Sequence, residues 1–167
     1  LFHQSLLRVA YDDSGEKPML LVKLGGEAHL TRKFLQERFE TDMNTLRDYL
    51  NRYLVEAFDL HGSPFEQALL CTDRRNSVEK KWEFQAVADS PIPVPGGVTT
   101  SAYGVILWML TATELKKNDR VLVCGAKGAM TAVLAKHIVG ESGEVRIIEW
   151  NPDTADWARE SITRHGF

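Results

Sequence analysis

Apolar and polar positions in this chain predict a β-rich start, a long helix, and a second half in which strands and helices alternate. Two apolar-rich runs, Ser5 to Ala10 and Met19 to Leu24, flank the segment YDDSGEKP, which is rich in turn-forming residues. The runs predict an antiparallel hairpin. We expect it to end at Gly25 and Gly26.

A long amphipathic helix is predicted next. Apolar residues recur at steps of three to five from Leu30 to Phe58, which forms one stripe on a helix of about eight turns. A stripe of Leu, Phe and Met docks on a core or on a partner helix. The segment CTDRRNSVEKK reads as a polar loop, so we place a domain boundary around residues 75 to 85. Residues 1–80 then form a hairpin and helix that recruit a substrate or partner, and residues 81–167 form a βαβ domain.

The second half opens on a loop. Residues 90–97, SPIPVPGG, contain three prolines and two glycines, which excludes a regular helix or a central strand. The hydroxyls of Thr99, Thr100 and Ser101 are expected to cap a helix from Ala102 to Leu115.

A strand–helix–strand–helix pattern follows. The strand RVLVC leads through a glycine turn to a helix from Ala129 to Val139, then to the strand EVRIIEW and a helix started by Asn151 and Pro152. This order predicts an α/β fold with a parallel, Rossmann-like sheet. The runs VLV and VRII lack alternation, as strands buried on both faces do.

Two features at the predicted strand ends suggest a ligand site. The turn from Gly125 to Gly128 lets a ligand approach the backbone closely, and Glu149, about 20 residues later, could accept hydrogen bonds from ribose hydroxyls. Either feature alone also has a structural explanation, as a chain bend or an exposed carboxylate. Together they favour a nucleoside-containing cofactor. The spacing does not separate NAD from S-adenosylmethionine.

Composition narrows the function classes. A net charge of -3 and a pI near 6.0 give no basic excess, so we expect no general binding to nucleic acid. The two cysteines match neither a zinc site nor a disulfide framework, so we expect no metal and a cytoplasmic, reducing location. No apolar run approaches the roughly 20 residues that span a bilayer, and the first residues do not resemble a signal peptide, so no membrane contact is expected.

The stretch from about Val87 to Gly166 resembles the protein-L-isoaspartate O-methyltransferases, a branch of the class I S-adenosylmethionine-dependent methyltransferases. The segment VADSPIPVPGGVTTSA looks like that family's loop, and LKKNDRVLVCG and GESGEVRIIEWNPDTADWARESITRHG look like the strands and helices after it. The positions in the loop that match the family are Asp89, Pro91, Pro93, Gly97, Thr99 and Ser101.

The resemblance implies carboxyl O-methylation of isoaspartyl or related carboxylates in a protein or peptide, with S-adenosyl-L-methionine as cofactor. It implies a substrate-binding and catalytic group of Ser101, Thr99 and Asp89, in which Ser101 would bind the substrate carboxylate at a helix N-terminus. It implies cofactor contacts from Gly125, Ala126, Gly128, Glu149 and Trp150. Simple helix capping is the alternative role of the hydroxyls.

Several departures from the family pattern support a second hypothesis. Val123 stands where the family has an acidic residue, GAKG is one residue shorter than Gly-x-Gly-x-Gly, and Lys127 stands where a glycine is usual. These changes predict weakened or altered cofactor binding. The alternative function is a non-catalytic methyltransferase-like domain used for protein association. An NAD-type domain is a third option, although Gly-x-Gly-x-x-Gly is absent.

The predicted sheet has only two parallel strands, which would leave edges and apolar faces exposed. We therefore expect an incomplete, N-terminal part of the methyltransferase sheet, truncated on its C-terminal side. Otherwise the N-terminal half, a second copy or a partner chain must cover the sheet and the helix stripe. Leu1 in place of Met likewise suggests a processed or trimmed start.

Overall fold

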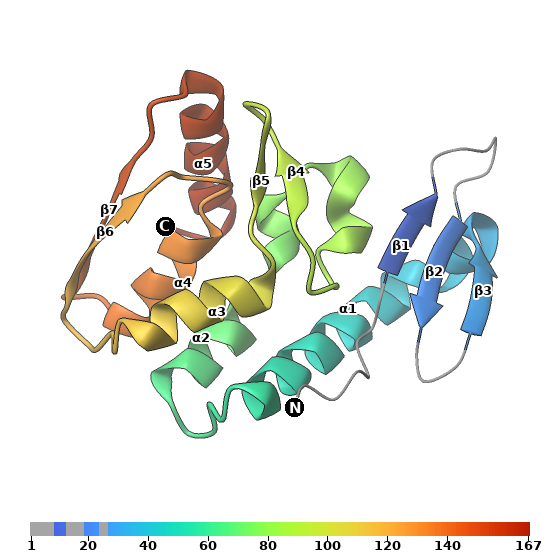
Figure 1. The fold of residues 1–167 in the computed structure, drawn as a ribbon, viewed down its shortest axis with the longest axis horizontal. Helices are drawn as coiled ribbons and strands as arrows, with labels where there is room; N and C mark the ends of the chain where they lie inside the picture. Colours follow the sequence, from blue (N-terminus) through green and yellow to red (C-terminus); the bar gives the residue numbers. More distant parts are fainter. Residues whose placement is uncertain (1–8, 13–18, 24–26) are drawn as a thin grey trace. The chain divides into compact units, whose positions relative to one another are not determined.

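The computed structural model describes residues 9–12, 19–23 and 27–167, with side chains from residue 43 onward, and is shown in Figure 1. Contacts within the chain divide it into two units, Leu1–Leu46 and Arg47–Phe167. The predicted boundary at residues 75–85 falls inside the second unit, because the segments on both sides of it pack into one core.

The first unit contains a three-stranded antiparallel sheet. Strands β1 (Val9–Asp12), β2 (Met19–Lys23) and β3 (Glu27–Thr31) pair in the order β1-β2-β3. The predicted hairpin is confirmed for β1 and β2, whereas its first residues, Ser5 to Arg8, and the glycine pair lie outside the described residues. The predicted end of the β structure was wrong, since β3 follows before helix α1 (Arg32–Ala57) begins. That long helix is confirmed.

Four helices form the main core of the second unit. They are the C-terminal half of α1, α2 (Pro64–Cys71), α3 (Tyr103–Ala112) and α4 (Met130–Val139). Ser63 starts α2, because its hydroxyl accepts a hydrogen bond from the Glu66 N–H and Pro64 takes a position that needs no donor. The core side chains include Leu54, Leu69, Ile106, Leu107 and Leu134.

The predicted polar loop after α2 is largely ordered into short 3-10 helices. These are η1 (Arg74–Ser77) and η2 (Lys80–Gln85). Asp73 caps η1 by accepting from the Arg75 N–H at 3.0 Å. The prediction of a polar loop was wrong because Arg74 and Ser77 are buried, where the terminal nitrogens of Arg74 and the Ser77 hydroxyl form hydrogen bonds inside the unit.

Residues 92–100 form a short hairpin, although their prolines and glycines predicted a loop. Strand β4 (Ile92–Val94) pairs antiparallel with β5 (Val98–Thr100), through a turn in which Gly96 and Gly97 have φ of 92° and 74°. Proline is tolerated because this sheet has two strands, so each is an edge strand. The hairpin exposes Thr99 and buries Thr100.

The predicted parallel βαβ unit is confirmed. Strands β6 (Arg120–Cys124) and β7 (Glu144–Ile148) pair in parallel, with Val121 opposite Val145 and Cys124 opposite Ile148. Helix α4 connects them, and α5 (Pro152–Arg164) follows β7. Asn151 caps α5 as expected, because its side chain accepts from the Thr154 N–H. The fold of this unit is mixed α/β with small sheets.

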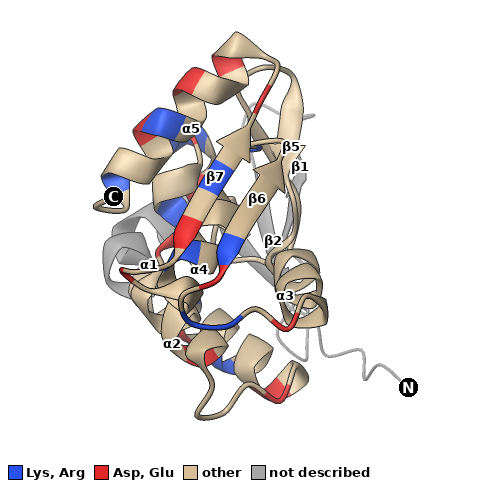
Figure 2. Ribbon diagram, turned by 90° about the vertical axis from the view of Figure 1, so that its left-hand side faces the viewer, with Lys and Arg blue, Asp and Glu red and all other residues tan. Residues whose placement is uncertain are grey.

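The β6–β7 sheet is covered on one face only by the described residues. Figure 2 shows α4 behind the two strands, and on the opposite face Leu122 and Ile148 are 56% and 58% exposed. The prediction that both faces are buried was wrong for this chain, because no described element packs on the outer face. No helix in the described ranges is long and apolar enough to cross a membrane.

Candidate cofactor and carboxylate site

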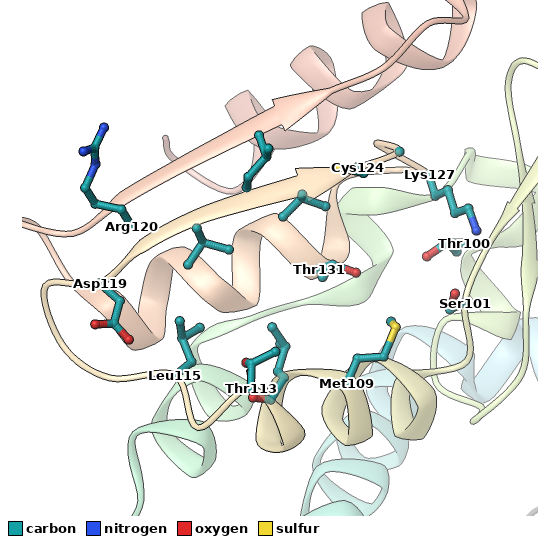
Figure 3. A pocket seen from close by; sticks show the side chains of 15 residues that line it. Thr100, Ser101, Met109, Thr113, Leu115, Asp119, Arg120, Cys124, Lys127 and Thr131 are labelled. Atoms are coloured by element: carbon teal, nitrogen blue, oxygen red, sulfur yellow. Dashed lines mark hydrogen bonds between the residues drawn. The ribbon is translucent and has the colours of Figure 1, made fainter.

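A pocket of about 590 Å³ lies between β6, the turn after it and helix α3 (Figure 3). Its walls combine apolar side chains of β6 and α3 with hydroxyl groups from other segments. Thr100 and Ser101 reach it from the end of the β4–β5 hairpin, and Gly125 and Lys127 reach it from the turn. The pocket therefore brings together part of the predicted substrate loop and part of the predicted cofactor turn.

Glu149 is held beside that turn. Its Oε2 accepts a hydrogen bond from the Ala126 N–H at 2.8 Å, and its Oε1 accepts from the Asn151 N–H at 3.0 Å. These backbone donors at Asn151 and Ala126 lower the pKa of the Glu149 carboxyl group, so it is ionised near neutral pH. Each oxygen keeps a second acceptor position for a ligand hydroxyl. The next residue, Trp150, is 90% exposed.

The glycine turn is longer than predicted. Gly125, Lys127, Gly128 and Ala129 all have positive φ, of 91°, 41°, 82° and 66°. Positive φ thus occurs at four of the five residues from Gly125 to Ala129, a segment with the length of the Gly-x-Gly-x-Gly pattern, in which Lys127 and Ala129 take the third and fifth places. The prediction of a shortened turn was wrong, because Ala129 adopts the backbone conformation that a glycine would adopt without strain.

A buried polar network supports the turn from behind. Ser161 Oγ donates to the Gly128 carbonyl at 2.9 Å, and Ser77 Oγ lies 2.9 Å from Ser161 Oγ and 3.0 Å from His165 Nε2. A Cβ on Gly128 would meet the Ser77 carbonyl oxygen at 2.9 Å. Gly128 is therefore packed against η1, whereas Gly125 lines the pocket.

The three predicted substrate-binding residues have different environments. Ser101 lines the pocket. Thr99 is exposed on β5, opposite Pro93. Asp89 Oδ1 accepts from the Gly104 N–H at 2.8 Å, at the start of α3. The predicted capping by Thr99, Thr100 and Ser101 was wrong. Ala102 holds the cap position without a side-chain bond, and Asp89, 15 residues earlier, satisfies the helix terminus.

The sequence analysis did not identify Arg74, which organises the predicted substrate loop. Its guanidinium donates to the carbonyls of Ala88, Ser90 and Ser101, at 2.9, 2.8 and 2.7 Å. Burial lowers the pKa of Arg74 to about 10, which still leaves it charged at neutral pH. In the sequence nothing separates Arg74 from its exposed-looking neighbour Arg75, so no local pattern could have identified it.

Helix α5 and its cap connect the hairpin to Glu149. Asn151 Nδ2 donates to the Gly96 carbonyl at 3.3 Å, and Thr154 Oγ1 donates to the Pro95 carbonyl at 3.1 Å. Asn151 also donates its N–H to Glu149, so one residue contacts both segments. The β4–β5 hairpin and the strand-end carboxylate are therefore positioned by a common element.

Residues 52–167 match the sequence model of the protein-L-isoaspartate(D-aspartate) O-methyltransferase (PCMT) family. The chain belongs to this family. The match begins at residue 52, so the resemblance inferred from the second half extends back into α1.

Individual PCMT relatives support the same assignment. The chain is 28% identical over 121 residues to the protein-L-isoaspartate O-methyltransferase of Ignicoccus hospitalis, a match that covers 72% of this chain and 57% of the relative. It is 34% identical over 101 residues to that of Pyrococcus horikoshii, covering 60% and 45%. The chain thus spans about half the length of the curated relatives it matches.

Solved structures agree on the fold. One protein-L-isoaspartate O-methyltransferase superposes with a TM-score of 0.65 at 21% identity, covering 72% of this chain and 39% of the other. A Plasmodium falciparum structure assigned to the same activity, in complex with S-adenosyl-L-homocysteine, gives a TM-score of 0.60 at 20% identity, covering 70% and 55%. That Plasmodium falciparum protein therefore binds S-adenosyl-L-homocysteine.

Proposed function

We propose that this chain carries the cofactor turn and substrate loop of an S-adenosylmethionine-dependent carboxyl O-methyltransferase. Its substrates would be isoaspartyl or related carboxylates in a protein or peptide. The main support for this proposal is the position of Glu149. The Ala126 N–H holds it next to the turn whose residues Gly125 and Lys127 line the same pocket as Ser101.

The residues present fit the cofactor. An ionised Glu149 with open acceptor positions suits the two ribose hydroxyls, the exposed Trp150 offers an aromatic face to a base, and Gly125 leaves the backbone accessible. Val123, half-buried in the wall of the pocket, supplies no second carboxylate there. Cofactor binding by this chain would therefore depend more strongly on Glu149 than it would in a site that also had a carboxylate at position 123.

The reaction requires positioning rather than a strong base. The bound cofactor would supply an electrophilic methyl group on a sulfonium, and a substrate carboxylate is already a nucleophile. In our proposal Ser101 holds the carboxylate by a hydrogen bond, and Arg74 fixes the Ser101 backbone through its carbonyl. Asp89 acts at one remove, since it fixes the start of α3.

Titration calorimetry with S-adenosylhomocysteine tests the cofactor half of the proposal. We expect binding by the chain, and a loss of at least tenfold in affinity for Glu149→Ala, because the ribose hydroxyls lose a charged acceptor. Glu141→Ala, an exposed carboxylate outside the pocket, is the matched control. Methyl transfer to an isoaspartyl peptide, but not to its aspartyl counterpart, tests the substrate half. Absence of cofactor binding would exclude the methyltransferase reading.

Exposed apolar groups favour a second candidate, a non-catalytic domain used for association. Besides Leu122 and Ile148 on the sheet, Trp108 of α3 is 65% exposed. A second copy or a partner chain could cover this surface. Light scattering at high concentration distinguishes the candidates: a monomer that methylates an isoaspartyl peptide would contradict association, whereas a dimer broken by Leu122→Lys, without cofactor binding, would support it.

We further propose that the N-terminal part, predicted over residues 1–80, recruits a substrate or partner. The family match begins at residue 52, so β1 to β3 and the first half of α1 lie outside it. A photo-reactive amino acid placed in β3 should crosslink an isoaspartyl protein substrate. If the same photo-reactive amino acid at position 80, in η2, crosslinks the substrate equally well, this role would be contradicted.

The free, exposed thiols of Cys71 and Cys124 suit the cytoplasmic location that we expect.

A further inference from the structure

Lys127 has a backbone conformation that a lysine rarely adopts. Its φ of 41° lies in the left-handed region, where any residue other than glycine has a conformational cost of about 1 kcal/mol because of its Cβ. It occupies the third place of the turn, between Gly125 and Gly128, which also have positive φ. Strain of this kind concentrates where a side chain is needed for binding or catalysis.

The side chain of Lys127 extends into the pocket. In Figure 3 its ammonium points toward the side of the pocket that carries Ser101, whose hydroxyl points back toward it. Thr131, from the first turn of α4, adds a hydroxyl to the same pocket. A cation and two hydroxyl groups, drawn from three separate segments, thus line one cavity.

Glu149, the strand-end carboxylate, does not use this cation as its main partner. Glu149 is held by the N–H groups of Ala126 and Asn151, and Lys127 contributes only in a minor way to its lowered pKa. Lys127 itself is exposed. Its ammonium is therefore accessible to a ligand that enters the pocket.

We propose that the Lys127 ammonium and the Ser101 hydroxyl form a carboxylate-binding site in this pocket. A charge-assisted hydrogen bond from the ammonium and a second one from the hydroxyl would bind the two oxygens of one carboxylate. The inference rests on the proposed function for the identity of that carboxylate. It belongs either to the methionine end of the cofactor or to the substrate, and both present the same group.

Calorimetry with three probes distinguishes these sources. S-adenosylhomocysteine has the methionine carboxylate, 5′-methylthioadenosine has the same nucleoside and sulfur without it, and an isoaspartyl peptide has the substrate carboxylate. Lys127→Met removes the charge but keeps a side chain at the strained backbone position, and Lys127→Arg keeps the charge. Lys80→Met is the control for net charge, because Lys80 is exposed in η2, outside the pocket. Circular dichroism verifies that each variant is folded.

We expect Lys127→Met to weaken either S-adenosylhomocysteine or the peptide about tenfold and to leave methylthioadenosine unchanged. A loss for S-adenosylhomocysteine identifies the cofactor carboxylate, and a loss for the peptide identifies the substrate. Lys127→Arg should stay within about threefold of the parent, because it keeps the cation. Lys80→Met should bind like the parent chain.

Unchanged binding of all three probes to Lys127→Met would overturn the carboxylate site while leaving the proposed function intact. Binding of the peptide alone, weakened by Lys127→Met, would support the site and overturn the cofactor. A parent chain that binds none of the probes would overturn both.

Discussion

The Arg74 guanidinium donates a hydrogen bond to the carbonyl oxygen of Ser101 at 2.7 Å, across 27 positions of sequence. The same guanidinium binds the carbonyls of Ala88 and Ser90, and it lies 5.6 Å from the centre of the Tyr103 ring. One buried cation therefore fixes both ends of the hairpin that presents Ser101 to the pocket.

Replacing Arg74 should destabilise the second unit strongly. Arg74→Met leaves three carbonyl oxygens without their donor, and we expect a loss of about 3 kcal/mol in the free energy of unfolding. Arg75→Met should lose less than about 1 kcal/mol, because the Arg75 ion pair with Asp73 is partly exposed. Urea unfolding measures both. Equal losses would show that Arg74 does not have this special role.

The neighbouring glycines of the β4–β5 turn offer a matched pair. Gly96 and Gly97 both have positive φ, but a Cβ on Gly96 would lie 1.9 Å from Thr154 Oγ1, whereas a Cβ on Gly97 would meet nothing within 4 Å. We expect Gly97→Ala to cost about 1 kcal/mol from backbone strain and Gly96→Ala about 3 kcal/mol from strain plus overlap. Gly96→Ala should also weaken cofactor binding, since Thr154 lies on the first turn of α5. Similar costs for the two variants would contradict the contact with α5.

Lys127→Gly should stabilise the fold and weaken the site. Glycine relieves the strain at a φ of 41°, which we expect to raise the free energy of unfolding by about 1 kcal/mol. The charge directed into the pocket is lost at the same time. The urea midpoints of Lys127→Gly and Lys127→Met distinguish the effect of backbone strain on stability from the effect of losing the lysine side chain, because only Lys127→Gly removes the strain. A less stable Lys127→Gly would show that the lysine side chain supports the turn itself.

His165 should make stability depend on acid pH. Burial lowers the pKa of His165 to about 4 in the folded chain, from 6.5 for an unperturbed imidazole. The unfolded state therefore binds more protons between pH 6.5 and 4, so the free energy of unfolding falls as pH falls through this window. Because His165 is partly exposed, we expect a change on the order of 1 kcal/mol.

His165→Gln checks the origin of that slope. The amide can still hydrogen-bond to Ser77 but does not titrate, so the variant should lose most of the stability change between pH 6.5 and 4. Burial also lowers the pKa of His137, so His137→Gln shows how much of any remaining slope that residue carries. A slope unaffected by His165→Gln would assign the effect to another group.

Local sequence patterns predicted the second half of the chain well. The β6–α4–β7 unit and the start of α5 at Asn151 were predicted because apolar runs, turn residues and caps act over a few positions. The same reasoning placed Glu149 and the glycine turn at neighbouring strand ends, since parallel strands end at one edge. The third strand before α1 and the hairpin at residues 92–100 were not predicted although their pairing is local, because glycines and prolines indicated that the chain leaves regular structure there. The buried Arg74 was not predicted because its partners lie 14 to 27 residues away.

By itself, then, the sequence determined the parallel strand pair, the long helix and the order of turn and carboxylate, all of which follow from short-range periodicity and backbone chemistry. Only the tertiary structure decided that Asp89 caps α3, that Arg74 holds the Ser101 carbonyl, and that Lys127 points into a pocket with Ser101. These relationships join segments 15 to 27 residues apart or from separate elements. These relationships depend on burial and on backbone dihedral angles, which are defined only once the chain is folded.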